Sequence, residues 1–410
     1  MSAGYSSRYR WVILSLLFVA TTINYFDRIV LSVLIPEIKK DLLLDDIAYG
    51  HILSAFQLAY TFGFLAVGKI IDRLGTKLGY LLSILLWSFA AAMHALCGTA
   101  FCLAAWRAAL GLTESGNFPA AIKAVSEWFP VKDRAFATSL FNSGSSISSI
   151  IGPPLIALIA INFGWRWTFF AFGFLGIFLA IGWQILYKKP PQPVEEEPVL
   201  QEKYPWALLL RRKETYGIML GKFLTDPVWW FYLFWMPNYL ADQRGFDLKG
   251  IAIAIPLIYS IATLLGFVGG WFPGYLMRRG WTVSRARKTA MLITALFLPI
   301  SATAVLAPNP WVTILLVSLA CGAHNGWSAN IFTLVSDCYP SHAVASVTGL
   351  AGFAGGIGGL FIATLAPGYI VTYFGYVPIF FLMGILHPLA FVAIAILVKS
   401  KRMQKMDLNA

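Results

Sequence analysis

The chain has 410 residues, of which 58% are hydrophobic and 12% are charged, and its formal net charge is +12. The charged fraction is about half of the roughly 25% that is usual in soluble domains, which excludes an ordinary water-soluble fold. The basic residues gather on one side of the predicted topology, so the positive charge gives nucleic-acid binding little support.

Long apolar segments recur along nearly the whole chain. Each is long enough to cross a hydrocarbon core of about 30 Å as a helix that rises about 1.5 Å per residue. They predict an all-α polytopic membrane protein with twelve spans, at 11–35, 48–71, 78–97, 101–125, 135–161, 167–187, 215–240, 251–277, 289–307, 309–336, 343–371 and 377–398.

The placement of lysine and arginine predicts the orientation of these spans. If the spans alternate, most basic residues fall on one side, which the positive-inside rule makes cytoplasmic. Both termini then face the cytoplasm, and the first apolar run is a retained helix of a cytoplasmic-membrane protein instead of a cleaved signal peptide. The inner loop 337–342 is an exception, because it contains no lysine or arginine.

Four charged residues interrupt the first and fourth spans. They are Asp27, Arg28, Arg107 and Glu114. A charge near the bilayer centre costs at least about 2.5 to 3.5 kcal/mol, so such residues are candidates for a functional site. Their depths predict an outer cluster of Asp27, Arg28 and Arg107, in which an Asp27–Arg107 pair is geometrically reasonable, with Glu114 deeper in the membrane. The alternative is that each charge forms a structural ion pair that fixes helix packing.

The loop after the second span contains glycines and charges in a compact pattern. Gly68 allows a close approach of helices, Gly75 permits a tight turn, and Asp72 and Arg73 provide opposite charges. Asp72 can then pair with basic groups or with a helix N-terminus in one conformation only. These residues form a predicted conformational lock, and the alternative is an ordinary hydrophilic turn.

The four cysteines form no metal-binding pattern, and the sequence predicts neither a metal nor a cofactor. Cys97 and Cys102 flank a short outer turn and could pair. We expect two free thiols there.

A polar, proline-rich segment at 188–213 divides the spans into two sets of six. The predicted division is a half at 1–187, a cytoplasmic linker at 188–213, a second half at 214–400 and a tail at 401–410. Three patterns recur at offsets of 210, 211 and 206 positions, which indicates duplicated halves: 125–130 with 335–340, 163–164 with 374–375, and Gly68 with Gly274. Such repeats place a substrate site near the membrane midplane, between the halves.

The second half offers aromatic and polar side chains for stacking on a sugar and hydrogen bonding to it. Lys222 and Asp226 share one face of the seventh span, although Lys222 could instead extend to the membrane interface. Trp229, Trp230 and Tyr232 follow them, with helix packing as the alternative role. His324 occupies the position that corresponds to Glu114, flanked by Asn325 and Asn330, and a structural buried histidine is its alternative role.

Several of these segments resemble the major facilitator superfamily. The loop from Gly68 to Lys77 is similar to its signature cytoplasmic loop, and the small-residue run in the fifth span is similar to its motif there. Further segments resemble the anion:cation symporter branch, and most closely its hexuronate transporters: 24–28, 107–114, 126–130, 141–146 and 223–227. The resemblance covers essentially the whole chain.

The resemblance implies roles for individual residues. Asp27 and Glu114 would couple protons, and Arg28 and Arg107 would bind the acid group of the substrate. Tyr60 matches a substrate-contacting tyrosine of a galactonate-transporting relative, whereas Ser145 replaces its glutamine and Gly356 replaces its asparagine. These differences predict a different ligand shape. The matching segments also contribute Tyr25 and Asn142 to the predicted substrate site.

The expected function is proton-coupled uptake of a sugar-acid anion, such as galacturonate or glucuronate, by alternating access. The predicted partners are that anion, protons and the lipid bilayer, and we expect a monomer that does not bind nucleic acid. The alternatives are an aldonate symporter, an organophosphate–phosphate exchanger and a nontransporting sensor. We do not expect an enzyme, because the sequence has no nucleophile triad, metal cluster or phosphate loop.

Overall fold

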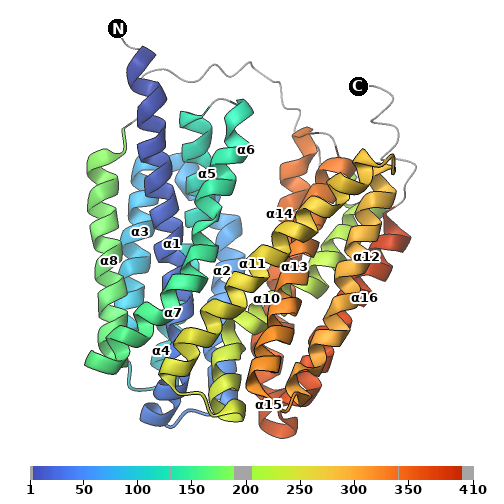
Figure 1. The fold of residues 1–410 in the computed structure, drawn as a ribbon. Helices are drawn as coiled ribbons and strands as arrows, with labels where there is room; N and C mark the ends of the chain where they lie inside the picture. The colour runs from blue at the N-terminus through green and yellow to red at the C-terminus, as the bar shows by residue number, and fades with distance from the viewer. Residues whose placement is uncertain (1–2, 130, 189–205, 340, 399–410) are drawn as a thin grey trace. The chain divides into compact units, whose positions relative to one another are not determined.

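The computed structural model describes residues 3–129, 131–188, 206–339 and 341–398. All regular elements in these ranges are helices, which confirms the expected all-α class (Figure 1). The α-helices are α1 (Ala3–Leu42), α2 (Asp46–Leu74), α3 (Thr76–Met93), α4 (Ala100–Glu114), α5 (Asn117–Trp128), α6 (Val131–Asn142), α7 (Gly144–Phe163), α8 (Trp165–Leu186), α9 (Trp206–Leu209), α10 (Lys213–Arg244), α11 (Leu248–Arg278), α12 (Val283–Ala302), α13 (Pro310–Cys338), α14 (Ser341–Gly358), α15 (Ala366–Phe374) and α16 (Tyr376–Leu397).

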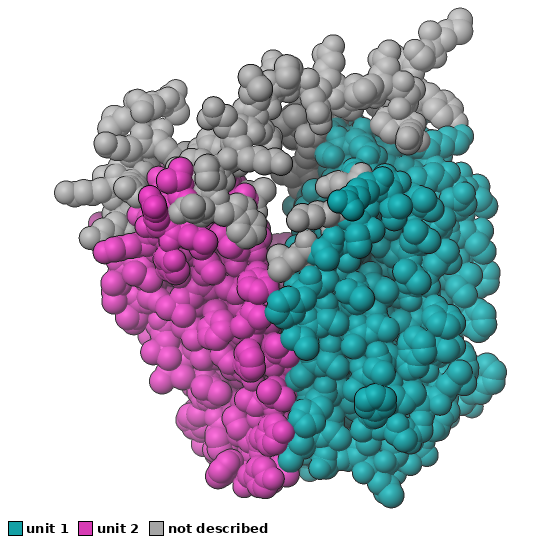
Figure 2. All heavy atoms as spheres, turned by 180° about the vertical axis from the view of Figure 1, so that it is seen from behind, with its two compact units in different colours: residues 1–199, 237–256 teal, residues 200–236, 257–410 magenta. Residues whose placement is uncertain are grey.

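Contacts between residues divide the chain into two compact units (Figure 2). Unit 1 comprises residues 1–199 and 237–256, and unit 2 comprises residues 200–236 and 257–410. A division at the linker alone would assign 237–256 to the second half. The adjoining ends of α10 and α11 belong to unit 1 because side chains such as Asn238 and Asp242 bond to Lys39 of α1.

Unit 1 is a bundle in which α2 packs on α4, α3 on α8, and α1 on α7 and α8. Its core is rich in aromatic side chains, including Tyr80, Trp87 and Trp183. Side chains cap two of its helices: Asp45 accepts a hydrogen bond from the Ala48 amide, and Thr99 accepts one from the Cys102 amide. These bonds satisfy amides that the first turn of a helix leaves unpaired.

In unit 2, α12 packs against α13 and α16. The buried side chains around this contact include Met291, Trp327, Ile331 and Ile394. The long helix α13 begins at Pro310, a position where the missing amide hydrogen costs nothing. The preceding Asn309 caps it by accepting a hydrogen bond from the Trp311 amide at 2.8 Å.

One repeated sequence pattern has the same local structure in both copies, whereas the acidic residue of another has different partners. Gly164 connects α7 to α8 with a φ of 87°, and Gly375 connects α15 to α16 with a φ of 74°. Both values lie in the region that favours glycine, so the repeated Phe-Gly pair marks the same type of turn. At the other repeat, Glu127 accepts a hydrogen bond from Thr76 and Asp337 pairs with Arg287 at 2.6 Å.

Eight helical segments in the described ranges are long and apolar enough to cross a membrane. They are 8–42, 76–96, 137–163, 165–186, 248–278, 283–306, 346–374 and 376–397. Several carry large apolar side chains on their surfaces, and Phe178 and Phe267 are 69% and 70% exposed. Exposed apolar surface of this extent is typical of helices that face lipid. The count of twelve spans remains a prediction.

Cys97 and Cys102 form a disulfide, so the expectation of two free thiols is wrong. The turn between η1 (His94–Leu96) and α4 brings their Cα atoms to 5.4 Å, which lies within the range that a disulfide spans. Sequence separation alone did not reveal this proximity. Cys321 and Cys338 are free thiols.

Candidate functional site

The four charged residues predicted in the membrane all lie in the interior of unit 1. Asp27 and Arg28 are on α1, whereas Arg107 and Glu114 are on α4. Their exposed fractions are 3%, 2%, 1% and 0% respectively. Charges are buried to this extent only where they are paired or serve a function, so their individual partners matter.

Arg28 and Glu114 form a buried ion pair across α1 and α4. The Arg28 Nε atom donates to Glu114 Oε2 at 2.7 Å, and its Nη2 atom donates to Asn24 Oδ1 at 3.2 Å. The predicted grouping, with Glu114 apart from an outer cluster, is therefore wrong. Depth along each helix axis did not reveal that the side chains of Arg28 and Glu114 meet across the contact between α1 and α4.

Arg107 does not pair with Asp27, contrary to the prediction. Its Nη1 atom donates to the backbone carbonyl of Asp27 at 3.1 Å, and its Nη2 atom donates to that of Arg28 at 2.8 Å. Arg107 thus ties α4 to the backbone of α1. Both carboxylate oxygens of Asp27 are buried and have no hydrogen-bond partner among the described residues, and the same is true of Glu114 Oε1.

Three aromatic rings surround the Arg28 guanidinium. Its Cζ atom lies 4.4 Å from the ring centre of Tyr60, 4.7 Å from that of Tyr25 and 5.5 Å from that of Phe56. Aromatic faces attract cations, and the attraction strengthens where water is excluded. The structure therefore brings the predicted Tyr25 and Tyr60 together around Arg28. Sequence reasoning missed Phe56, although it lies one helical turn before Tyr60.

Glu114 is the last residue of α4, at an interruption of the predicted fourth span. The chain passes through Ser115 and Gly116 before α5 begins at Asn117. A Cβ atom on Gly111 would lie 2.4 Å from the Phe56 carbonyl oxygen, so only glycine allows this approach of α4 to α2. The C-terminal end of a helix has a partial negative charge, which disfavours a carboxylate there unless a cation such as Arg28 is near.

Asn142 and Ser145 lie at a second interruption, between α6 and α7. Ser145 Oγ donates to the Asn142 carbonyl at 2.8 Å, and the Asn142 side chain is exposed. The α7 helix is fixed to α1 nearby, because Ser148 Oγ donates to the Thr22 carbonyl. Among the described residues, neither Asn142 nor Ser145 forms a hydrogen bond with Arg28 or Glu114.

In unit 2, Lys222 and Asp226 form the ion pair that their spacing on one helix face suggests. The Nζ atom of Lys222 lies 2.9 Å from Asp226 Oδ2 and 4.3 Å from the ring centre of Phe332. A Cβ atom on Gly355 of α14 would lie 2.1 Å from the same Asp226 oxygen. The α10 and α14 helices are therefore in close contact at the ion pair.

A continuous cluster of rings surrounds the predicted Trp229 and His324. The His324 ring stacks on Trp229 with a centroid distance of 5.7 Å, and Tyr259 meets Trp229 edge-on at 5.3 Å. His324 also approaches His387, with 3.3 Å between His324 Nδ1 and His387 Nε2. Sequence reasoning missed Tyr259 and His387, and the available signal was a histidine inside the apolar twelfth span.

The other predicted residues of unit 2 have packing contacts. Trp230 stacks on Phe234, and Tyr232 is buried against Phe231 and Phe380. Asn325 Nδ2 donates to the Ala262 carbonyl at 3.4 Å, and Asn330 Nδ2 donates to the carbonyls of Gly326 and Gly269. Both asparagines therefore connect α13 to α11. The contacts of Trp230 and Tyr232 are those expected of their alternative role in helix packing.

The structure describes only part of the predicted conformational lock at the end of α2. Gly75 has a φ of 79° between α2 and α3, as a tight turn requires, and the Arg73 side chain is exposed. The side-chain surroundings of Gly68 and Asp72 lie outside the described part of the structure.

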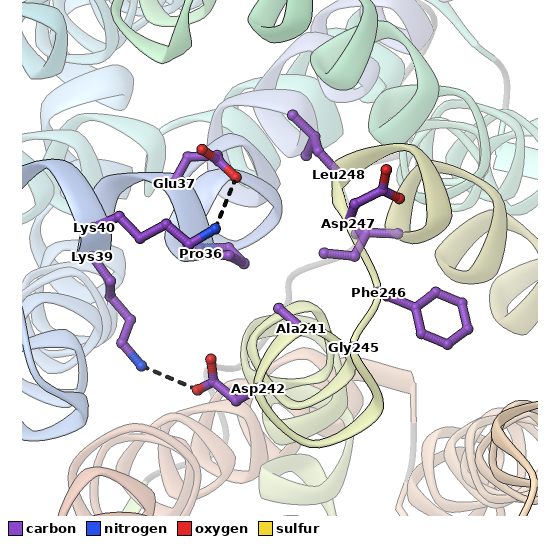
Figure 3. A pocket seen from close by; sticks show the side chains of 11 residues that line it. Pro36, Glu37, Lys39, Lys40, Ala241, Asp242, Gly245, Phe246, Asp247 and Leu248 are labelled. Carbon is purple, nitrogen blue, oxygen red and sulfur yellow. Dashed lines mark hydrogen bonds and ion pairs between the residues drawn. The ribbon is translucent and has the colours of Figure 1, made fainter.

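A cavity of about 470 Å³ lies in unit 1 beside the end of α1 (Figure 3). Lys39 points across it to Asp242, with 3.1 Å between the charged atoms, and also binds Asp46 at 2.9 Å. The buried charges do not line this cavity, whose residues are Pro36, Glu37, Lys39, Lys40, Ala241, Asp242, Gly245, Phe246, Asp247, Leu248 and Ile251.

The structure has apolar helices long enough to cross a membrane and a buried set of charges, and the comparisons with known proteins show that the chain is a membrane transporter and not an enzyme. Residues 17–363 match the model of the Major Facilitator Superfamily. The chain belongs to this superfamily, as its sequence motifs predicted.

Named relatives resemble the chain over most of its length. The hexuronate transporter of Escherichia coli K12 is 30% identical and covers 96% of this chain and 94% of its own. The galacturonate transporter of Dickeya chrysanthemi is 31% identical over 74% of this chain and 93% of its own. The D-galactonate transporter of Escherichia coli O6:H1 is 28% identical, with 92% and 93% covered.

The fold also matches solved structures. A bacterial homologue of the human lysosomal transporter Spinster, in an inward-facing and occupied conformation, has a TM-score of 0.76. It is 17% identical and the match covers 98% of this chain and 97% of the other. At this identity the similarity supports the fold alone.

Proposed function

We propose that this protein imports a sugar-acid anion, such as galacturonate or glucuronate, together with protons across the cytoplasmic membrane. The names of its relatives support the substrate class. The observation that carries the coupling is the buried ion pair between Arg28 and Glu114. In this arrangement the Glu114 carboxylate binds the Arg28 guanidinium, which is the group that a substrate carboxylate would bind.

Protonation of Glu114 releases Arg28 for the substrate. A neutral carboxyl group loses most of its attraction to the guanidinium, and a substrate carboxylate restores the charge balance with two parallel hydrogen bonds. Proton binding and substrate binding therefore favour each other. Affinity for the ionised acid rises as pH falls on the outside, and the higher pH of the cytoplasm promotes loss of both proton and substrate.

The structure supports different tasks for the two arginines. Arg28 binds the substrate carboxylate, because its present partner is a side chain that a proton can neutralise. Arg107 positions Arg28, because both of its Nη atoms bond to backbone carbonyls of α1. Tyr25 and Tyr60 hold the Arg28 guanidinium in place and contact the substrate beside it. Asp27 is the second proton-coupling candidate, since its buried oxygens have no hydrogen-bond partner among the described residues.

Uptake into proteoliposomes tests the proposal. The purified protein should accumulate galacturonate, glucuronate or galactonate when the outside is made acidic, and uptake should cease when the gradient is abolished. Glu114→Gln should lose gradient-driven uptake and keep counterflow exchange of labelled substrate. Asp41→Asn, which removes a carboxylate from an exposed ion pair with Arg166, is the matched control and should behave as wild type.

Three outcomes would contradict the proposal. Absence of gradient-dependent uptake for every sugar acid would exclude this function. Exchange without any effect of pH would favour an anion exchanger. Loss of both uptake and exchange in a folded Glu114→Gln protein would assign Glu114 a structural role.

A further inference from the structure

The ring cluster of unit 2 contains a pair of histidines that the transport proposal does not use. His324 is on α13 and His387 is on α16, and their exposed fractions are 5% and 0%. Their facing nitrogens, His324 Nδ1 and His387 Nε2, are 3.3 Å apart. Burial favours the neutral form of each ring, so one nitrogen of this contact donates and the other accepts.

The surroundings of His387 decide which nitrogen donates. His387 Nδ1 is buried and has no hydrogen-bond partner among the described residues. If His324 donated, the proton of His387 would sit on this Nδ1 atom, as a buried N–H group without a partner. If His387 donates from Nε2, its Nδ1 holds only a lone pair. Unpaired buried N–H groups are rarer than unpaired acceptors, so the second arrangement is favoured.

The tautomer of His324 follows directly. Its Nδ1 accepts from His387, so its proton lies on Nε2. His324 then presents an N–H donor, with its ring held between two neighbours: Trp229 stacks on it at 5.7 Å, and the His387 ring lies at 5.4 Å in a nearly perpendicular orientation. Trp229 is half-buried, whereas His387 is wholly enclosed.

We propose that His387 is a positioning residue that fixes His324 as a neutral hydrogen-bond donor to an oxygen of the transported acid. The inference rests on the proposed function for the identity of the ligand. Its structural part, the tautomer, is independent of that function. The ligand chemistry is a hydroxyl oxygen of a polyhydroxy acid, which accepts the hydrogen bond beside the aromatic face of Trp229.

Nitrogen-15 NMR of the histidine-labelled, full-length protein in nanodiscs tests the structural part. The His324 signals should show a protonated Nε2 and an unprotonated Nδ1 that accepts a hydrogen bond. His387→Phe should alter the Nδ1 signal because it removes the donor. His387→Gln should preserve it, since the glutamine amide nitrogen takes the place of Nε2. A proton on His324 Nδ1 in the wild type would overturn the inference.

Transport assays test the functional part. His387→Phe should raise the KM for the acid about 3- to 10-fold and leave the maximal rate unchanged. This factor corresponds to the loss of one neutral hydrogen bond. His387→Gln should stay near wild type. The KM change should vanish for the deoxy analogue that lacks the contacted oxygen. Asp41→Asn, which removes a carboxylate from an exposed ion pair with Arg166 in unit 1, is the control and should leave KM unchanged.

The remaining outcomes separate the two proposals. A fall in maximal rate at unchanged KM, or equal effects of Phe and Gln, would reduce His387 to helix packing and overturn the inference. If the wild type transports no sugar acid while the NMR signals show the Nε2 tautomer, the proposed function fails and the substrate part of the inference fails with it. The tautomer assignment would still stand.

Discussion

The charge of a guanidinium in a water-free interior must be compensated by nearby groups, and Arg28 has three kinds of partner. It has an anionic partner in Glu114, an amide oxygen in Asn24 and the faces of aromatic rings. Removing one partner of such a buried pair leaves an uncompensated charge, which is strongly destabilising. A substrate carboxylate that replaces Glu114 as it becomes neutral avoids this cost.

Replacing Arg28 with lysine should distinguish the contribution of its charge to substrate binding from the contribution of its hydrogen-bond geometry. The Arg28→Lys variant keeps a cation but cannot offer two parallel N–H groups, so we expect the KM for the sugar acid to rise about 10- to 100-fold. The measurement is uptake at several substrate concentrations. Arg107→Lys should instead lower thermal stability, because its two bonds to α1 are lost. Equal kinetic effects of both substitutions would contradict the division of tasks.

Asp27 should determine how many protons accompany each anion. We expect the wild type to move net positive charge inward with each monoanion, so that an inside-negative potential stimulates uptake. Asp27→Asn removes one proton site at nearly constant volume and should abolish this stimulation while leaving pH-driven uptake. Uptake in proteoliposomes with an imposed potassium diffusion potential measures the difference. If the membrane potential still stimulates uptake by Asp27→Asn, the second proton must bind to a residue other than Asp27.

At the scale of elements, glycines control how closely helices meet. The approach of α14 to α10 places Gly355 against Asp226, and Gly358 would meet the Phe223 carbonyl at 2.1 Å if it carried a Cβ atom. The interruptions of the fourth and fifth predicted spans, at 115–116 and 143, also fall at small residues. Small residues at helix contacts are typical of membrane proteins, where close packing replaces the hydrophobic effect.

A pair of alanine substitutions on α14 tests this packing. In Gly355→Ala the new methyl group must displace the Asp226 carboxylate, and we expect destabilisation of about 1 to 3 kcal/mol. Gly352→Ala lies one turn earlier, where a Cβ atom would have nothing within 4 Å, so it should be neutral or slightly stabilising. Thermal unfolding of both purified variants gives the comparison. Equal melting temperatures would show that α14 can shift away from α10.

At the scale of the whole molecule, the disulfide supports the proposed orientation. Disulfides persist in oxidising compartments, so the link between Cys97 and Cys102 favours an outside location for the turn between α3 and α4. The positive-inside pattern independently assigns this turn to the outside. Cys338, the last residue of α13, should then lie on the cytoplasmic side.

Thiol labelling in intact cells measures this orientation. After treatment with a membrane-impermeant reductant, an impermeant maleimide should react with the half-buried Cys102, and without reduction it should not. Cys338 should react only after the cells are permeabilised, and Cys338→Ser identifies its signal. Labelling of Cys338 in intact cells would reverse the proposed topology.

The sequence predicted the features that depend only on the order of residues along the chain. Apolar length gave the helices, repeated motifs gave matching turns at Gly164 and Gly375, and rare charges marked the buried cluster. The pairing of Arg28 with Glu114 was not predictable in this way, because it depends on how α1 and α4 are aligned and on the reach of a side chain. His387 was missed for a related reason, since only three-dimensional packing places α16 beside His324.

The Asp27 carboxyl group has no hydrogen-bond partner among the described residues. Its protonation affects the ratio of internal to external substrate concentration that the protein can reach. If it carries a second proton, each cycle moves one positive charge down the membrane potential. This adds about 2.3 kcal/mol for every 100 mV. At about 1.4 kcal/mol per tenfold change, that energy supports roughly a 50-fold higher internal concentration of the acid, even when the pH is equal on both sides.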